Sequence, residues 1–271
     1  MQMKNQVFAA FNHFFDAVYV LTLQRAGDRQ RRVEKELAGL KYQFFYGVDK
    51  HHLDMDQVMK DGIYDDVSHQ KLKRTHRSMS LGEVACALSH RAIYQDIVDN
   101  GYQKALILED DVQPNLHCNH HFRESLATLP KDWDLLMLGY YSEKYPSLYS
   151  KLQIKTYELY HHLRIANWEK VDPRFIRKMA MSSLNQHWLK IGKLVGGHAY
   201  AVTQKACSAF IELQTPVVLQ ADRVFSHQAL LHGMKAYAIK EKVFGLSEMA
   251  NSSYIEYPTM LEKVKTLAYK N

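Results

Sequence analysis

Short runs of apolar residues alternate with a segment of helical composition at the start of the chain. The run 17–23 is followed by a turn and by the segment 29–40, which has helical composition and Asp28 as its expected N-cap. A second apolar run, 42–46, then leads into a turn at Gly47. This order predicts a β-α-β unit at the beginning of an α/β fold.

The helix that follows has the clearest boundaries in the sequence. Ser80 is its expected N-cap, and Glu83 stands three residues later, at the spacing of a capping box. Apolar residues recur on one side as far as Val98, and the pair Asn100-Gly101 predicts the end of the helix.

Similar signals predict further elements toward the C-terminus. The expected strands are 104–109, 133–139, 193–202 and 236–239, and the expected helices are 120–129, 203–213 and 221–232. We expect 51–77 to be an irregular insertion, 140–188 to mix helix and loop, and the tail after Tyr257 to form a basic amphipathic helix. The alternation predicts one mixed sheet flanked by helices.

The composition is typical of a soluble globular protein. Of the 271 residues, 46% are apolar and 24% are charged, and the mean hydropathy is −0.37. The sequence predicts no membrane-spanning helix, because no run of about 18 apolar residues occurs, and the first 15 residues lack a signal-peptide pattern. Cys86, Cys118 and Cys207 are scattered and odd in number, which favours a reducing compartment. We therefore expect a cytoplasmic protein.

Positive charge suggests which partners the surface attracts. The net charge is +6 and the pI is about 9.0, which favours nucleic acid, anionic lipid or phosphorylated ligands. Basic residues gather over 71–77 and, more loosely, over 144–178. These clusters are either solvated faces or anion-binding surfaces. Nucleic acid is the least favoured partner, because no recognisable nucleic-acid-binding module accompanies them.

Three consecutive acidic residues are the most informative motif. Glu109, Asp110 and Asp111 follow the apolar run 105–108, which reads as a buried strand. Open α/β sheets bind ligands at the carboxyl ends of their strands. Three adjacent carboxylates there repel one another unless a cation or a donor-rich ligand lies between them. The motif predicts a magnesium or manganese ion that holds a diphosphate, with a solvated acidic turn as the alternative.

Several other polar residues are candidates for binding. His90 lies on the long helix, where it could donate to a phosphate or serve a structural role. Arg25 and Arg29 stand at the exit of the first strand, where an anion could bind, whereas we expect Arg31 and Arg32 on a solvated helix face.

The later candidates lie around two glycines and one aspartate. Gly196 and Gly197 precede His198 and would allow a ligand to approach closely, or they mark a β-bulge. Asp222 is a candidate general base, although it could equally cap a helix or join an ion pair. The His- and Cys-containing segment 117–121 matches no closed zinc pattern, so we assign no zinc site to it.

Five motifs, taken together, resemble glycosyltransferase family 25, the lipooligosaccharide biosynthesis transferases related to the collagen galactosyltransferases. The motifs are Val18–Arg25 with Asp28-Arg29, Leu81–His90, Ala105–Val112, Asp132–Gly139 and Gly197–Tyr200. The resemblance extends over residues 17–255. The family's late serine-containing motif is matched only by 252–255, which lacks the expected acidic residue.

The resemblance implies a fold, a donor and a set of site residues. The fold would be a GT-A-like, Rossmann-type α/β/α sandwich with a mixed central sheet, and the donor a UDP-sugar, commonly UDP-galactose. The residues that would contact the donor are Leu23, Arg25, Arg29, His90, Glu109, Asp110, Gly197 and His198. The divalent metal, manganese or else magnesium, would be held by Asp110 and Asp111, and Asp222 would be the catalytic base.

The resemblance also implies how the chain is organised and what it does. Residues 1–256 would form a single glycosyltransferase domain, with 140–192 as a variable acceptor-side insertion and 257–271 as a basic tail. The enzyme would invert the sugar while extending a lipooligosaccharide or lipopolysaccharide acceptor at an anionic inner membrane. The alternatives are a catalytically silent family member that acts in binding or adhesion, and a metal-dependent phosphoesterase.

Overall fold

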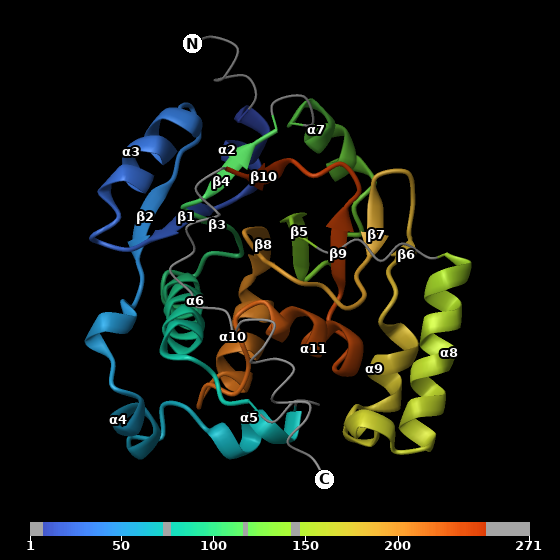
Figure 1. The fold of residues 1–271 in the computed structure, drawn as a ribbon. Helices are drawn as coiled ribbons and strands as arrows, with labels where there is room; N and C mark the ends of the chain where they lie inside the picture. The colour runs from blue at the N-terminus through green and yellow to red at the C-terminus, as the bar shows by residue number, and fades with distance from the viewer. Residues whose placement is uncertain (1–7, 73–76, 116–118, 142–146, 248–271) are drawn as a thin grey trace.

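A mixed sheet of eight strands forms the centre of the molecule (Figure 1). The computed structural model describes residues 8–72, 77–115, 119–141 and 147–247. In spatial order the strands are β2 (Gln43–Tyr46), β1 (Ala17–Thr22), β3 (Lys104–Glu109), β8 (Ala199–Thr203), β5 (Leu135–Gly139), β9 (Ala236–Ile239), β7 (Trp188–Lys190) and β6 (Ser182–Ser183). The pairs β1–β2, β1–β3 and β5–β9 are parallel, and β8 is antiparallel to both of its neighbours. The sheet is therefore mixed, as predicted.

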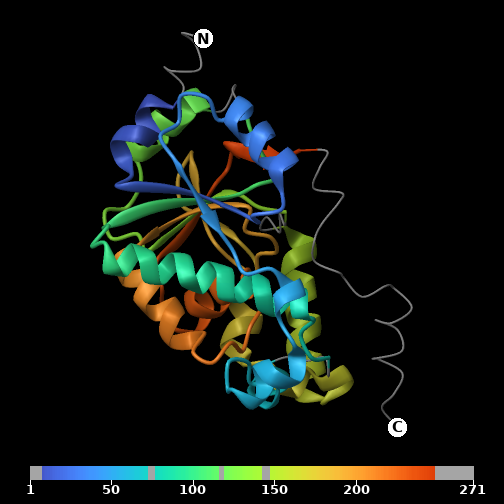
Figure 2. The same cartoon turned by 90° about the vertical axis from the view of Figure 1, so that its left-hand side faces the viewer.

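Helices cover both faces of this sheet (Figures 1 and 2). One layer consists of α6 (Leu81–Asp99), α10 (Gln204–Leu213) and α11 (Arg223–Leu231), and the other of α2 (Ala9–Phe14), α3 (Gly27–Glu36) and α7 (Asn119–Ala127). Within β3, Ala105 and Ile107 join the first core, while Leu106 and Leu108 join the second. A strand buried on both faces reads as a continuous apolar run, which explains the sequence of β3. The predicted α/β/α sandwich is confirmed.

A small antiparallel sheet fixes the acidic motif. The strand β4 (Val112–Pro114) pairs with β10 (Phe244–Leu246). Since β3 ends at Glu109 and β4 begins at Val112, the two aspartates between them form the connecting turn. The short strands β4 and β10 were not predicted.

The segment predicted as an irregular insertion contains three short helices, so that prediction was wrong. They are η1 (Lys50–His52), α4 (Met55–Lys60) and α5 (Asp66–Leu72). Asp49 and Asp54 cap the first two through their side chains. Val58 and Tyr64 then pack against Leu88 of α6 in a separate small core, which holds the segment on the domain.

A helical group extends beyond the β6 end of the sheet. It comprises α8 (Leu148–His162), η2 (Ile165–Lys170) and α9 (Pro173–Lys178), which pack around Trp168, Ile176 and Met179. Figure 1 shows α8 as the outermost element on this side. The mixture of helix and loop was predicted, whereas β6 and β7 were missed.

Two further predictions failed at the level of local structure. The N-cap position of α3 is Ala26, so Asp28 lies inside the first turn rather than capping it. The predicted strand 193–202 is a strand only from Ala199, because the backbone N–H groups before it bond outside the sheet. Leu194 N donates to Ser226 Oγ at 2.9 Å and Gly196 N to Asp222 Oδ2 at 2.9 Å.

The capping box of α6 is confirmed in both of its halves. The Ser80 hydroxyl accepts from Glu83 N at 3.3 Å, and the Glu83 carboxylate accepts from Ser80 N at 2.9 Å. No described helix is long and apolar enough to cross a bilayer. The predicted tail helix, the motif at 252–255 and Cys118 lie outside the described residues.

Candidate functional site

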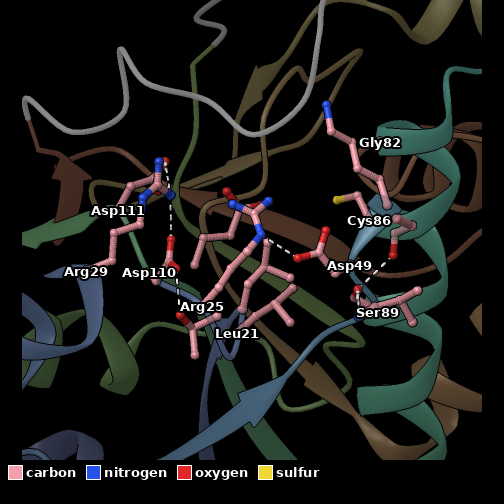
Figure 3. A pocket seen from close by; sticks show the side chains of 15 residues that line it. Leu21, Arg25, Arg29, Asp49, Gly82, Cys86, Ser89, Asp110 and Asp111 are labelled. Carbon is pink, nitrogen blue, oxygen red and sulfur yellow. Dashed lines mark hydrogen bonds and ion pairs between the residues drawn. The ribbon is translucent and has the colours of Figure 1, made fainter. Parts of the chain in front are cut away.

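The carboxyl ends of β1 and β3 open into a pocket (Figure 3). Its lining comes from β1 and the start of α3, from the loop after β2, from the first turns of α6 and from the acidic turn. The lining residues are Leu21, Thr22, Leu23, Arg25, Arg29, Val48, Asp49, Lys50, Gly82, Ala85, Cys86, Ser89, Glu109, Asp110 and Asp111.

The protein itself satisfies both oxygens of Asp110. Arg29 Nη1 lies 2.6 Å from Oδ1 (Figure 3). Thr22 Oγ1 donates to Oδ2 at 2.7 Å. Asp110 is only 5% exposed. Its first role is therefore to fix the acidic turn against β1 and α3, and its predicted role as a metal ligand stays a prediction.

Arg32 holds the backbone of the same turn. Its guanidinium donates to the carbonyl oxygens of Asp110 at 2.7 Å and Val112 at 2.9 Å. The prediction of a solvated face was therefore wrong for Arg32. It is confirmed for Arg31, which is largely exposed and pairs with Asp28.

Asp111 is left with unused bonding capacity. Its Oδ1 is buried and has no hydrogen-bond partner, and its Oδ2 lies 4.0 Å from Arg29 Nη1. Burial, followed by the charges of Glu109 and Asp110, raises the pKa of Asp111 to about 7. A cation at Oδ1 would supply the missing partner and offset this repulsion, so the turn fits a divalent ion.

The protein offers only part of a metal coordination shell. Across the part of the chain that the structure describes, no group of three or more His, Cys, Asp or Glu is arranged to hold an ion. Magnesium-type sites commonly use one or two carboxylates together with substrate phosphates. A diphosphate in the pocket would therefore have to complete the shell.

Glu109 stands between the pocket and a buried polar network. His90 Nε2 lies 3.7 Å from Glu109 Oε1, and His90 Nδ1 lies 2.6 Å from the Tyr200 hydroxyl. That hydroxyl is 2.8 Å from the hydroxyl of Tyr94. Burial alone raises the pKa of Glu109, but the nearby His90, His198 and Arg29 together lower it below the ordinary value. Glu109 is therefore an ionised carboxylate in the lining of the pocket.

His198 lies beside Glu109 but does not line the pocket. It is 3% exposed and lies against the backbone of Phe244. Burial lowers its pKa, although the charge of Glu109 opposes this. Gly139 makes room for the ring, because a Cβ there would lie 2.5 Å from His198 Nε2.

The two glycines before His198 make room for side chains of the protein itself. They do not leave an open path for a ligand. A Cβ on Gly196 would collide with the ring of Tyr141, and one on Gly197 would lie 2.6 Å from Phe225 Cε2. Gly196 also has a φ of +79°, which favours glycine. The predicted donor contact of Gly197 stays a prediction, and its position outside the pocket lining does not favour it.

Asp222 lies near the pocket without lining it. Its Oδ2 accepts from Gly196 N, and its side chain is about one quarter exposed. Burial raises the pKa of the Cys86 thiol, and the charges of Glu109 and Asp222 raise it further. Cys86 lines the pocket, so these two carboxylates lie close to the same pocket residue.

The sequence left several lining residues unidentified. Thr22 is the last residue of β1, and Asp49 forms an ion pair with Arg25 that lowers the pKa of Asp49. The Ser89 hydroxyl accepts from Val48 N at 2.8 Å, which ties the loop after β2 to α6. Thr22 could have been predicted as a site residue, because it is a polar residue at the end of a buried strand.

The predicted residues divide into two groups. Those that line the pocket are Leu23, Arg25, Arg29, Glu109, Asp110 and Asp111; those outside the lining are His90, Gly197, His198 and Asp222. His90 and His198 reach the pocket through Glu109, whose pKa both of them lower.

The structure thus combines an α/β/α sandwich, an acidic turn at the carboxyl edge of its sheet and the glycine-to-histidine helix α6. The chain belongs to glycosyltransferase family 25, whose model, described as an LPS biosynthesis protein, matches residues 15–225.

Similar curated proteins come from animals. A glycosyltransferase 25 family member from Drosophila pseudoobscura pseudoobscura is 32% identical, covering 46% of this chain and 20% of that protein. Procollagen galactosyltransferase 1 from Danio rerio is 31% identical over 46% of this chain and 21% of that protein. The human inactive glycosyltransferase 25 family member 3 is also 31% identical, over 46% and 22%. The aligned region thus spans about a fifth of these relatives.

Proposed function

We propose that this glycosyltransferase is an inverting hexosyltransferase that moves galactose from UDP-galactose to a lipooligosaccharide or lipopolysaccharide saccharide. The observation that carries the proposal is the buried, unpartnered Oδ1 of Asp111 beside an Asp110 that the protein has already neutralised. This arrangement suits a cation-bridged diphosphate. The galactosyl specificity is supported by the relative named procollagen galactosyltransferase 1.

In this proposal, different pocket residues bind different parts of the donor. Asp111 would be the main ligand of the metal ion, with Asp110 and Glu109 on the metal or on the donor, and the bound ion would offset negative charge on the leaving diphosphate. Arg25, Lys50 and the first turn of α6 at Gly82 surround the remainder of the pocket. Cationic side chains and a helix N-terminus suit the phosphates and the nucleotide.

Inversion requires a base opposite the leaving group. In this proposal the Asp222 carboxylate takes the proton of the acceptor hydroxyl as that oxygen bonds to the anomeric carbon and the bond to UDP breaks. The hydrogen bond from Gly196 N fixes the orientation of Asp222. The carboxylate remains partly exposed, so an acceptor hydroxyl can reach it.

Acceptor selection is assigned to the insertion 140–192. This segment contributes α8, η2 and α9, which extend beyond the sheet on the side away from β2 (Figure 1). The acceptor is a glycolipid or oligosaccharide in this proposal, in keeping with the family description as an LPS biosynthesis protein. A cytoplasmic enzyme working at the inner face of a membrane would meet such acceptors.

The test is a screen of nucleotide sugars for thermal stabilisation, with and without manganese, followed by a transfer assay. UDP-galactose with manganese at 100 times its dissociation constant should add about 2.7 kcal/mol to the free energy of unfolding. Transfer to a saccharide acceptor with inverted anomeric configuration would support the proposal. Stabilisation without transfer or donor hydrolysis would favour a silent protein, and phosphate release from a model phosphoester would favour a phosphoesterase.

A further inference from the structure

The outer face of α8 carries a row of exposed leucines. Leu148, Leu152, Leu159 and Leu163 are exposed by 88%, 65%, 54% and 56% of their surface. Leu163 is the C-cap residue, and the spacing of the row places all four on one side of the helix. Below, "the α8 outer face" means these four leucines with Lys151 and Lys155.

The opposite side of α8 is already packed. Ile154, Tyr157 and Tyr160 contact the small core around Trp168. The ring of Tyr157 stacks on that of Trp168 with 4.0 Å between the centroids. The helix therefore packs on the protein through its inner face. The row of leucines takes no part in that packing.

Such a concentration of apolar surface is specific to this element. Half of the large apolar side chains exposed in the described residues belong to α8 or to the three residues after it: Leu148, Tyr149, Leu152, Leu159, Leu163 and Ile165. Single exposed leucines need no explanation, but a contiguous exposed apolar patch marks an interaction surface.

Charge indicates what this surface binds. Lys151 and Lys155 are exposed among the leucines, and His162 and Arg164 are exposed at the C-terminal end. Glu158 is the one carboxylate in α8, and it forms a 3.1 Å ion pair with Arg177 of α9. The α8 outer face thus presents leucines and cations with no acidic side chain of its own.

These features favour an anionic lipid surface, and not a second copy of the chain, as the partner of the α8 outer face. Pairing two such faces would bring the lysines of one copy against those of the other without a carboxylate to offset them. A helix with leucines on one face and lysines beside them is the pattern of helices that lie in the interface of an anionic bilayer. The lysine ammonium groups can extend to lipid headgroups while the leucines enter the acyl boundary.

We propose that the α8 outer face docks the protein on an anionic lipid bilayer. The helix has 15 residues, which gives about 22 Å of contact along the membrane plane. The surface lies outside the pocket lining. The docking therefore does not depend on the proposed transfer reaction, and its test requires no activity.

The test is sedimentation of the full chain with vesicles of phosphatidylcholine containing about 30% phosphatidylglycerol, compared with phosphatidylcholine alone. One variant, Leu152→Gln with Leu159→Gln, removes two leucines; another, Lys151→Gln with Lys155→Gln, removes two charges. Matched controls are Val67→Gln with Leu72→Gln in α5 and Lys41→Gln with Lys60→Gln, all at exposed positions outside α8, and both lysines lie outside the two basic clusters. Circular dichroism and the melting temperature check that each variant folds.

The expected result is binding of the wild type to the anionic vesicles. The leucine variant should bind at least tenfold more weakly to them. The lysine variant should lose roughly 25-fold, because each lysine near an anionic surface contributes about fivefold. Both controls should remain within about twofold of the wild type. Equal binding by the α8 variants and the wild type would overturn the proposal, as would a wild-type dimer, seen by light scattering, that the leucine variant dissociates.

Discussion

Arg29 and Asp110 form an ion pair of 2.6 Å in which both side chains are less than 10% exposed. The same guanidinium nitrogen is 4.0 Å from Oδ2 of Asp111. One arginine therefore neutralises the first aspartate of the turn and only partly compensates the second. A buried carboxylate that keeps an unused oxygen at the edge of a pocket needs a partner, and we propose that a metal-bound donor supplies it.

Replacing Asp111 by asparagine should separate metal binding from folding. The metal-free variant should melt at a higher temperature than the wild type, because a buried charge without a partner is removed. Manganese with UDP, which should stabilise the wild type by about 2.7 kcal/mol at 100 times the dissociation constant, should leave the variant nearly unchanged. Differential scanning fluorimetry measures both effects. Equal stabilisation of the two proteins would exclude Asp111 as a ligand.

Replacing Asp222 by asparagine should affect the chemical step but not donor binding. The amide oxygen can still accept from Gly196 N, so the local fold should persist. We expect kcat to fall by about 10²–10⁴ while the dissociation constant for UDP stays within about twofold. Asp172→Asn is the matched control, because Asp172 occupies the N-cap position of α9 as Asp222 does that of α11. A wild-type kcat in Asp222→Asn would reassign the base.

Glu83 should give the protein a defined acid sensitivity. Burial raises the pKa of Glu83, but hydrogen bonds from Arg77, Ser80 N and Gln220 outweigh it and lower the value to about 2. Because the folded-state pKa lies below the ordinary value of 4.5, ionised Glu83 stabilises the protein above about pH 4.5, and this stability is lost as the pH falls toward 2.

Substitution of that carboxylate tests the pH window. Glu83→Gln should lower the free energy of unfolding by about 2 kcal/mol at pH 7 and flatten its dependence between pH 4.5 and 2. Urea denaturation across this range measures the difference, with the exposed helix residue Glu212 replaced by glutamine as the control. Parallel pH profiles for Glu83→Gln and the wild type would contradict the assignment.

Gly139 should tolerate no side chain. A methyl group there would lie 2.5 Å from His198 Nε2 and 2.7 Å from the Phe244 carbonyl oxygen. Gly139→Ala should therefore cost about 1–3 kcal/mol in unfolding free energy and displace His198 from Glu109, lowering activity. Gly245→Ala is the control, since a Cβ there has its nearest neighbour at 3.9 Å. Equal melting temperatures for the two variants would show that both the His198 ring and the backbone at Phe244 shift without cost.

Much of the sheet could be predicted because its strands are buried on both faces. The runs that became β1, β3 and β5 are continuous and apolar, and α6 carries both residues of a capping box. In these elements local composition and tertiary burial agree, so the pattern was sufficient. The acidic turn was predicted on the same basis, as the end of β3.

The missed elements depend on partners far away in the sequence. The strands β4 and β10 have three residues each and form only because residues 112–114 meet 244–246. The strand β6 has two residues and depends on its pairing with β7. No periodicity can develop over such lengths, so these strands have no local signal.

The different roles of the two aspartates in the acidic motif could not be predicted from the sequence. Asp110 and Asp111 are adjacent and chemically identical, yet Thr22 and Arg29 both bond to the first. The orientation of a two-residue turn decides which carboxylate faces the protein. Arg32 looked like a surface residue for the same reason, because its partners are backbone carbonyl groups of that turn.

The most direct test of the account is diffraction from a crystal grown with UDP and manganese, with data collected at the manganese absorption edge. We predict an anomalous peak within coordination distance of a carboxylate oxygen of Asp111, and a UDP diphosphate bound to the same ion between the acidic turn and Arg25. A nucleotide located elsewhere, with no anomalous peak beside Asp111, would contradict the account.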